Sequence, residues 1–303
     1  MPDDRYAIDS AGSYDLGLRR VRRMGYGAMQ LAGDNVFGPP RDRDEALRVL
    51  RTAVAEGVNH IDTAQFYGPG VVNELIREAL HPYPADLAIV SKVGARRDDG
   101  GAVLLYDRPD ELRQGLEANL ATLGVDQLAA VNLRLMDGSE PGARLGAQLA
   151  SLIKAREEGL IEGIGLSNIS VRHLLRAVEQ TEIVCVQNLF NLADQRSSDV
   201  LAECVERNIA FVPFFPLGQW RGLLSSPVLT ALGWRLSATP AQLALAWLLD
   251  LAPNILLIPG TRTRAHLQEN LASASVELYD EARAVLAAEF PALVDVRPER
   301  KNR

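Results

Sequence analysis

The sequence predicts a single α/β domain folded as a (β/α)8 TIM barrel. From Met24 onward, eight short apolar segments alternate with eight amphipathic helical patterns. The apolar segments are nearly continuous, which is typical of parallel strands buried on both faces by the helices that connect them. The 303 residues of the chain also suffice for such a barrel, which usually takes about 250 residues.

Strands and helices are expected to follow one another in strict alternation. The expected strands are Gly25–Leu31, Val58–Ala64, Leu87–Gly94, Leu128–Met136, Glu162–Asn168, Ile183–Asn191, Ala210–Leu217 and Asn254–Gly260. The expected helices are Asp44–Glu56, Val71–Leu80, Pro109–Leu123, Leu145–Glu158, Val171–Glu179, Ser197–Arg207, Thr239–Leu251 and Thr263–Ala272. Ser170 and Thr239 are expected helix N-caps, because a side-chain oxygen there can accept a hydrogen bond from a free backbone N–H.

The expected barrel core spans about residues 24–273 of one domain that covers residues 1–303. The remaining length falls in a polar N-terminal segment, in loops near 96–107 and 219–237, and in a tail after Ser273. A doubly wound sheet is the alternative, and it requires a Gly-x-Gly-x-x-Gly fingerprint between its first strand and a helix. Residues 25–30 end in Gln30 and no helix is expected after them, so the barrel is favoured.

Composition and charge argue against several kinds of partner. A net charge of -7 disfavours nucleic acid, and no apolar run is long enough to cross a membrane. The chain starts without the features of a secretory signal and has two cysteines, so a cytoplasmic location is expected. The histidines lack the spacing of zinc ligands, so we expect no metal. Nothing in the sequence indicates an oligomeric state, and a small molecule is the expected partner.

A carboxylate, a phenol and an amine fall at the ends of two successive expected strands. Asp62 and Lys92 each lie near a strand end, and Tyr67 follows Asp62 by five residues. Neighbouring parallel strands bring such residues to one C-terminal edge, where barrel enzymes have their active sites. A phenol is a weak acid and an adjacent ammonium favours the phenolate, so this set can transfer a proton to a carbonyl. Each residue alone has an ordinary structural explanation, but their coincidence predicts catalysis.

These residues and several motifs resemble the aldo-keto reductases, which are NADPH-dependent (β/α)8 oxidoreductases with an Asp-Tyr-Lys-His tetrad. The resemblance runs from residues 24–31, Met-Gly-Tyr-Gly-Ala-Met-Gln-Leu, to the Glu269-Asn270 pair. It implies that Asp62, Tyr67 and Lys92 are catalytic, with Tyr67 as the proton donor. It also implies that the reaction is reduction of a carbonyl by NADPH.

The resemblance further implies which residues bind the cofactor. Ser167, Asn168 and Gln187 would hold the nicotinamide carboxamide. Phe214 would stack on the nicotinamide ring, for which a ring face is sufficient. The other implied cofactor contacts are Gly27, Met29, Asp62, Pro216, Leu217, Gly260, Glu269 and Asn270.

Residues 258–270 look like the part of the site that binds the adenosine phosphate. Thr261, Arg262 and Arg264 lie where an expected strand gives way to a helix, and a helix N-terminus favours an anion. Guanidinium groups suit a 2′-phosphate, which NADPH carries and NADH lacks. NADPH is therefore expected over NADH.

Arg134 departs from the family pattern. It ends the fourth expected strand, where the family has its tetrad histidine, and no nearby histidine replaces it. Arginine cannot act as a general acid, but it can donate a charge-assisted hydrogen bond to an anionic oxygen. This strand end, together with stretches 37–43, 92–97, 183–188 and 213–218, resembles the bacterial pyridoxal reductases of the family. Those enzymes reduce pyridoxal to pyridoxine with NADPH.

For a pyridoxal reductase, Arg134 would bind the phenolic oxygen of the substrate while Tyr67 addresses the aldehyde. Phe37, Phe66 and Trp220 would supply flat apolar walls. Three alternatives stay open: a reductase of other aldehydes or ketones, a slow NADPH-binding regulatory protein with the same fold, and a barrel isomerase or hydrolase with the strand-end aspartate as base. The last of these leaves the expected cofactor residues without a role.

Overall fold

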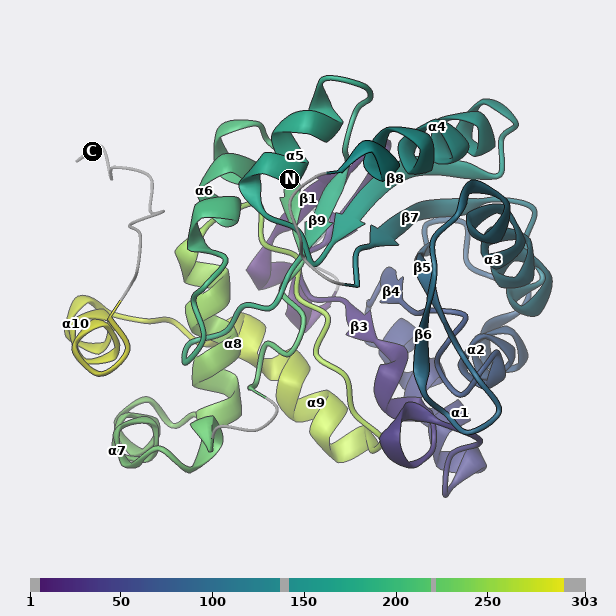
Figure 1. Ribbon diagram of the computed structural model, residues 1–303. Helices are drawn as coiled ribbons and strands as arrows, with labels where there is room; N and C mark the ends of the chain where they lie inside the picture. The colour runs from purple at the N-terminus through teal and green to yellow at the C-terminus, as the bar shows by residue number, and fades with distance from the viewer. Residues whose placement is uncertain (1–5, 137–141, 219–221, 292–303) are drawn as a thin grey trace.

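The computed structural model describes residues 6–136, 142–218 and 222–291, and it has a ring of parallel strands surrounded by helices (Figure 1). In order around the ring, the strands are β3 (Tyr26–Gly27), β4 (His60–Asp62), β5 (Ala88–Arg97), β7 (Leu128–Arg134), β8 (Ile161–Ser167), β9 (Cys185–Gln187) and β10 (Ala210–Phe211). Each strand pairs in parallel with its neighbour, so their C-terminal ends share one edge.

The last expected strand closes the ring, although it forms only isolated bridges. Ile255 bridges in parallel to Phe211 of β10, and Leu257 bridges in parallel to Met24, just before β3. The Gly25 amide also donates a hydrogen bond to the Leu257 carbonyl at 2.8 Å. The sheet is therefore a closed (β/α)8 barrel, as the sequence predicts.

The helices on the outside of the barrel match the expected positions. They are α1 (Arg43–Ala55), α2 (Val71–Leu80), α3 (Pro109–Leu123), α4 (Ala143–Glu157), α5 (Val171–Val178), α6 (Ser198–Glu206), α8 (Pro240–Leu251) and α9 (Arg264–Ala272). Thr239 caps α8 as expected, because its side chain accepts a hydrogen bond from the Gln242 amide. Ser170 is the N-cap residue of α5, where its hydroxyl hydrogen-bonds to the His173 ring at 2.8 Å.

Most strands are shorter than expected, β4, β7, β9 and β10 among them, and one is longer. The first expected strand, Gly25–Leu31, contains only β3 and continues as a short 3-10 helix, η2 (Ala28–Leu31). β5 is longer than expected, because its outer half pairs antiparallel with β6 (Val103–Tyr106). This β5–β6 hairpin occupies a part of the chain for which only a loop was expected.

Further segments add to the barrel. An antiparallel hairpin of β1 (Ser13–Leu16) and β2 (Arg19–Arg22) lies in the N-terminal segment, and α7 (Pro227–Leu236) and α10 (Asp280–Glu289) lie where a loop and a tail were expected. The other 3-10 helices are η1 (Ala7–Ala11), η3 (Asp34–Val36), η4 (Leu223–Ser225) and η5 (Ser273–Ser275). α7 has a local sequence signal, since Ser226 accepts from the Leu229 amide and Pro227 occupies the first turn.

The β1–β2 hairpin fills the N-terminal end of the barrel. Leu16 and Val21 of the hairpin are buried in one cluster with Ala88, Ala130 and Ala210 of the barrel strands. Protein interiors are closely packed, so small side chains on the strands leave the room that the hairpin fills. The candidate site lies at the opposite end, where the strands finish.

Arg23 stabilises the contact between the first and last strands, where the barrel closes. Its guanidinium donates to the carbonyls of Leu249 and Ala252, at the end of α8, at 2.8 and 2.6 Å. It also donates to the Ile255 carbonyl at 3.1 Å. Burial lowers the pKa of Arg23 to about 10, so it stays charged at neutral pH. A cation at a helix C-terminus is favourable, and here it satisfies carbonyls that the helix leaves free.

Replacing Arg23 by methionine keeps the aliphatic stem but removes these donors. The carbonyls then lie partly buried without partners, so we expect the free energy of unfolding to fall by about 2–4 kcal/mol. Denaturant unfolding followed by circular dichroism measures the change. Arg20→Met is the control. Among the described residues the Arg20 side chain forms an exposed pair with Asp15 alone, so this substitution should change stability by less than about 0.5 kcal/mol. Equal losses in the two variants would contradict the role of Arg23.

Candidate active site

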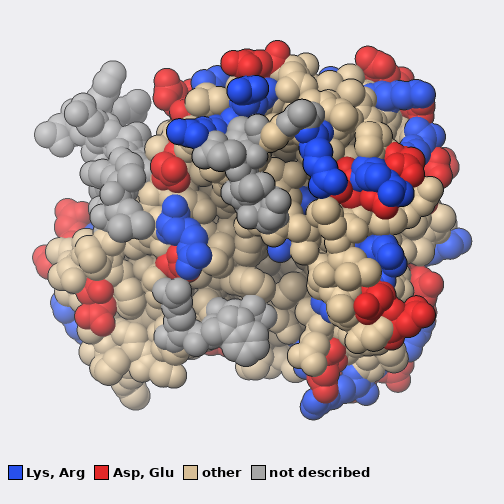
Figure 2. Space-filling view, in the orientation of Figure 1, with Lys and Arg blue, Asp and Glu red and all other residues tan. Residues whose placement is uncertain are grey.

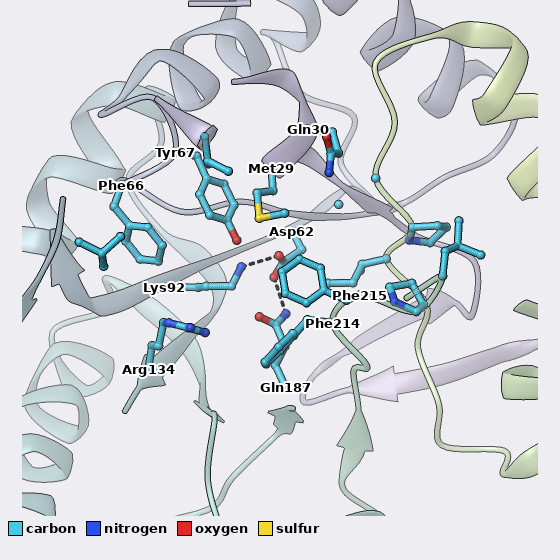
Figure 3. A pocket seen from close by; sticks show the side chains of 18 of the residues that line it. Met29, Gln30, Asp62, Phe66, Tyr67, Lys92, Arg134, Gln187, Phe214 and Phe215 are labelled. Atoms are coloured by element: carbon cyan, nitrogen blue, oxygen red, sulfur yellow. Dashed lines mark hydrogen bonds and ion pairs between the residues drawn. The ribbon is translucent and has the colours of Figure 1, made fainter. Parts of the chain in front are cut away.

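The predicted catalytic residues meet at the C-terminal edge of the barrel (Figure 3). Parallel pairing of β4 with β5 brings Asp62 beside Lys92. The Lys92 ammonium donates to the Asp62 carboxylate and, at 2.9 Å, to the Thr63 carbonyl. The other carboxylate oxygen accepts from the Gln187 side chain at 2.8 Å. Only 3% of the Lys92 side chain and 4% of the Asp62 side chain are exposed, so this ion pair is shielded from solvent.

Tyr67 follows β4 and points its hydroxyl toward the Lys92 ammonium (Figure 3). The ammonium nitrogen is 5.1 Å from the centre of the Tyr67 ring. Burial raises the pKa of Tyr67, and this effect exceeds the lowering by the positive charges of Lys92 and Arg134. The Lys92 ammonium favours the phenolate as predicted, but the larger effect of burial was not anticipated. Loss of hydration penalises the charged phenolate more than the nearby cations stabilise it.

Lys92 keeps its proton. Burial alone would lower the pKa of Lys92, but the attraction of Asp62 and Tyr67 outweighs burial, and the net pKa is raised. At neutral pH the site therefore presents a neutral phenol beside a charged ammonium. This is the arrangement of a group that can give up a proton next to a cation that stabilises the resulting anion.

A buried hydrogen-bond network behind the sheet holds the strands that carry these residues. Asn73 of α2 accepts from the Thr63 hydroxyl at 2.8 Å and donates to the side chain of Asn119 of α3 at 3.0 Å. Asn119 accepts from the Ser91 hydroxyl at 2.5 Å and donates to the Lys92 carbonyl at 3.3 Å. These four side chains are all fully buried. The network thus fixes the ends of β4 and β5 to the two helices outside them.

A cavity of about 350 Å³ opens at this end of the barrel. The predicted site residues that line it are Gly27, Met29, Asp62, Phe66, Tyr67, Lys92, Arg134, Gln187, Phe214, Pro216, Leu217 and Gly260. Lining residues that the sequence did not predict are Gln30, Val36, Arg97, Val103, Phe215, Gly218, Ile258 and Pro259. Figure 2 shows this face hollowed near its centre, with acidic and basic side chains interspersed around the hollow.

The predicted carboxamide-binding residues lie at the ends of β8 and β9. Ser167 and Gln187 are in register on these neighbouring strands. The Ser167 hydroxyl and the Gln187 side-chain oxygen are buried and have no hydrogen-bond partner among the described residues. Buried polar atoms are nearly always paired, so these two fit a polar ligand group such as a carboxamide. Asn168 differs, since its side chain donates to the Leu135 carbonyl at 2.7 Å.

The predicted adenosine-phosphate residues continue along the chain from the cavity wall. Gly260 lines the cavity, and Thr263 caps α9, whose first residue is Arg264. The predicted cofactor-binding residues that do not line the cavity are Ser167, Asn168, Thr261, Arg262, Arg264, Glu269 and Asn270. Arg262 donates to the Gln30 carbonyl at 2.9 Å, and Arg264 pairs with Glu45 of α1. Both arginines therefore have protein partners in this structure.

Arg134 ends β7 and contributes to the cavity wall. Its guanidinium carbon is 5.7 Å from the centre of the Phe214 ring, and no carboxylate in the described part of the chain pairs with it. A structural salt bridge, the ordinary explanation for such an arginine, is therefore absent from the described residues. The charge is available to an anion in the cavity.

Arg97 is a second guanidinium in the cavity wall, and the sequence analysis missed it. It lies on the outer part of β5 and donates to the Phe66 carbonyl at 3.1 Å and to the Gly101 carbonyl. Burial lowers its pKa. The sequence offers only a basic pair in an expected loop as a signal. The β5–β6 pairing that brings Arg97 to the cavity depends on contacts that no local pattern reveals.

The structure places the three aromatic residues that were predicted to form apolar walls differently. Phe66 lines the cavity and contacts Tyr67 edge to face, with ring centres 5.2 Å apart. Phe37 does not line it, which corrects the prediction, because its ring packs beside Gly101 at the turn of the β5–β6 hairpin. Trp220 lies outside the described residues.

Residues 6–136, 142–218 and 222–291 contain no group of three or more histidine, cysteine or acidic side chains that could hold a metal. None of the helices within these ranges is long and apolar enough to span a bilayer. Cys185 and Cys204 are both free and buried.

Comparison with known proteins gives consistent matches. The Aldo/keto reductase family model matches residues 23–288. The pyridoxine 4-dehydrogenase of Escherichia coli (strain K12) is 49% identical over 280 residues, which cover 91% of this chain and 98% of that protein. An uncharacterized oxidoreductase of Schizosaccharomyces pombe is 36% identical over 287 residues, covering 93% and 92% of the two chains.

Solved structures support the same relationship. A thermostable aldo-keto reductase in complex with the inhibitor epalrestat has a TM-score of 0.77 and 30% identity, and the match covers 91% of this chain and 98% of that one. An aldo/keto reductase of Klebsiella pneumoniae shares the fold, with a TM-score of 0.75, 24% identity, and 94% and 95% coverage. With the family model matching most of its length, this chain belongs to the aldo/keto reductase family.

Proposed function

We propose that this protein is an NADPH-dependent carbonyl reductase that reduces the aldehyde of pyridoxal to give pyridoxine. The observation that carries the proposal is the neutral Tyr67 phenol aimed at the buried Lys92–Asp62 ion pair at the base of a cavity. The 49% identity to a pyridoxine 4-dehydrogenase supports the substrate, since that enzyme acts on the corresponding alcohol. The free cysteines fit a cytoplasmic location.

NADPH would lie along the edge of the barrel from β8 to the start of α9. Ser167 and Gln187 would bind its carboxamide through the polar atoms that lack partners, and the Phe214 ring would stack on the nicotinamide. The 2′-phosphate would be bound by Arg262 and Arg264, because guanidinium groups suit phosphate. The Klebsiella pneumoniae relative was solved with NADP bound. We take 24–273 as the barrel core of a single domain.

When bound, NADPH supplies a hydride to the carbonyl carbon. The side chains supply the proton and the electrostatic stabilisation. Tyr67 would donate its hydroxyl proton to the carbonyl oxygen as negative charge develops there. Lys92 stabilises the phenolate that remains, and Asp62 keeps Lys92 charged and in place. In the reverse direction, the Tyr67 phenolate would act as the base that removes a proton from the alcohol.

Arg134 would select the substrate. Pyridoxal carries a phenolic oxygen next to its aldehyde, so an aldehyde held at Tyr67 places that oxygen beside the reacting group. The Arg134 guanidinium lines the same cavity without a carboxylate partner in the described residues. A charge-assisted hydrogen bond to an anionic oxygen is stronger than one between neutral groups. Phe66 would provide an apolar wall for the pyridine ring.

The direct test is the rate of NADPH oxidation with pyridoxal and with a panel of neutral aldehydes and ketones. We expect the highest kcat/KM with pyridoxal. A neutral aldehyde preferred by tenfold or more would make the pyridoxal assignment wrong and leave a reductase of other carbonyl compounds. Binding of NADPH with no turnover of any compound would make the catalytic proposal wrong and favour a regulatory protein.

Replacing Tyr67 by phenylalanine removes the hydroxyl and keeps the ring that contacts Phe66. Because positioned acid–base groups typically contribute about 10²–10⁴-fold to rate, we expect kcat for pyridoxal to fall by at least about 100-fold. NADPH affinity, measured by fluorescence titration, should stay within about twofold and shows that the site remains intact. Near-normal turnover in this variant would assign the proton donor to another group.

The pH dependence follows from the raised pKa of Tyr67. Reduction needs the protonated phenol, which persists through neutral pH and is lost only as the pH rises through the raised value. With a neutral aromatic aldehyde, which does not itself titrate, kcat for reduction should be level near neutrality and fall on the alkaline side. Oxidation of the alcohol should rise over the same range. A decline in reduction that begins at neutral pH would contradict a buried, protonated Tyr67.

Replacing Arg134 by alanine separates substrate binding from catalysis. If Arg134 binds an anionic oxygen of the substrate, KM for pyridoxal should rise about tenfold or more while a neutral aromatic aldehyde is nearly unaffected. If it instead polarises the reacting carbonyl, kcat should fall for both substrates, because that interaction strengthens only in the transition state. Equal losses in kcat with unchanged KM would overturn the binding role.

A further inference from the structure

The N-terminus of α9 is already occupied by a carboxylate from another helix. Glu45 of α1 accepts a hydrogen bond from the Arg264 backbone amide at 3.0 Å and from the Arg264 guanidinium at 3.3 Å. Its other oxygen accepts from Arg48, one turn further along α1, at 3.0 Å. The Glu45 side chain is 19% exposed. The hydrogen bond from the Arg264 amide is the largest of the effects that lower the pKa of Glu45 to about 2, so it is ionised at any working pH.

These are the groups that a bound phosphate would use. A free amide at a helix N-terminus and a guanidinium are the donors that bind phosphate in proteins. In the cofactor site proposed above, on which this inference rests, they face the 2′-phosphate of NADPH. NADH has a neutral hydroxyl in that position, so its binding does not depend on the charge of Arg264 to the same degree.

We propose that Glu45 limits the preference for NADPH over NADH by competing with the 2′-phosphate for Arg264. Binding the phosphate requires Arg264 either to leave Glu45 or to share its donors with two anions that repel each other. Both routes weaken the binding of NADPH and leave the binding of NADH nearly unaffected. Arg48 remains as a partner for Glu45 when Arg264 leaves, so the competition reduces NADPH affinity without preventing binding.

Arg262 is placed differently and is the arginine open to the phosphate. Its Nε donates to the Gln30 carbonyl at 2.9 Å, and the nearest carboxylate oxygen, on Asp34, is 4.0 Å away. The Gln30 carbonyl is neutral, and Asp34 pairs more closely with Arg41, at 2.6 Å, so the positive charge of Arg262 is only weakly compensated. The two arginines therefore contribute unequally, with Arg262 binding the phosphate and Arg264 restrained by Glu45.

The opposite role for Glu45 is to orient Arg264 for the phosphate. The two roles predict opposite signs, because removing a competitor strengthens NADPH binding and removing an orienting partner weakens it. Glu45→Gln distinguishes them, since glutamine keeps the length and an acceptor oxygen and loses only the charge. Asp44→Asn is the matched control: it changes net charge equally on the same helix turn, and among the described residues Arg264 pairs with Glu45 and not with Asp44.

The experiment is titration of each variant with NADPH, NADH and adenosine 2′,5′-bisphosphate, with Kd measured by fluorescence or calorimetry at fixed ionic strength. Glu45→Gln should lower the Kd of NADPH and of the bisphosphate by about three- to tenfold and change the Kd of NADH by less than twofold. Asp44→Asn should change every Kd by less than twofold. Weaker NADPH binding in Glu45→Gln, or equal shifts for NADPH and NADH, would overturn the competition.

A double variant tests whether the effect passes through Arg264. In an Arg264→Ala background, Glu45→Gln should no longer tighten NADPH binding, because the guanidinium for which Glu45 and the phosphate compete has been removed. Tightening of the same size in that background would show a general charge effect and overturn the proposal. Failure of the wild-type protein to bind the bisphosphate would overturn the 2′-phosphate site itself. Loss of pyridoxal turnover alone would concern only the proposed substrate, since the titrations contain none.

Discussion

The buried ion pair between Lys92 and Asp62 is the interaction on which the rest of the site depends. Removing two charges from water costs several kcal/mol each unless their hydrogen bonds are replaced. Here Asp62 accepts from Lys92 and Gln187, and Lys92 also donates to the Thr63 carbonyl. These bonds connect β4, β5 and β9 across the interior of the barrel. A pair that requires this many partners tolerates little displacement, so the same contacts that make it stable also fix its position.

The surroundings of the pair are built to keep it in place. On the outside of the sheet, Asn73 and Asn119 hydrogen-bond to the chain beside Asp62 and to the Lys92 carbonyl. On the inside, the β1–β2 hairpin fills the barrel below, where small strand residues leave room for it. Satisfied polar networks in a buried setting are rigid, because each broken bond leaves an unpaired buried group. The site is thus held from two sides by groups that do not take part in chemistry.

The sequence predicted the barrel and the meeting of Asp62, Tyr67 and Lys92, because apolar strands ending in polar residues follow a regular pattern. The α7 and α10 helices and the β1–β2 hairpin were missed, since they lie outside that repeat. Arg97 and Glu45 were missed for a different reason. The first reaches the cavity through an antiparallel pairing, and the second reaches Arg264 across 219 residues of chain. The sequence predicted the effect of the Lys92 ammonium on the Tyr67 pKa but not the larger, opposite effect of burial, because burial is a tertiary property that composition does not reveal.

The electrostatics of the cavity explain how a family member can function without the tetrad histidine. A phenol that donates a proton is neutral before the reaction and negatively charged after it, so it needs an environment that suits both states. Burial keeps the Tyr67 phenol protonated, while the charges of Lys92 and Arg134 lower the cost of the phenolate. In the proposed reaction, Lys92 stabilises the phenolate and Arg134 binds the phenolic oxygen of the substrate. A histidine could move a proton, but once Tyr67 supplies the proton, a fixed positive charge at the end of β7 is sufficient. Arg134 fulfils that condition, because it ends β7 and its guanidinium lines the cavity.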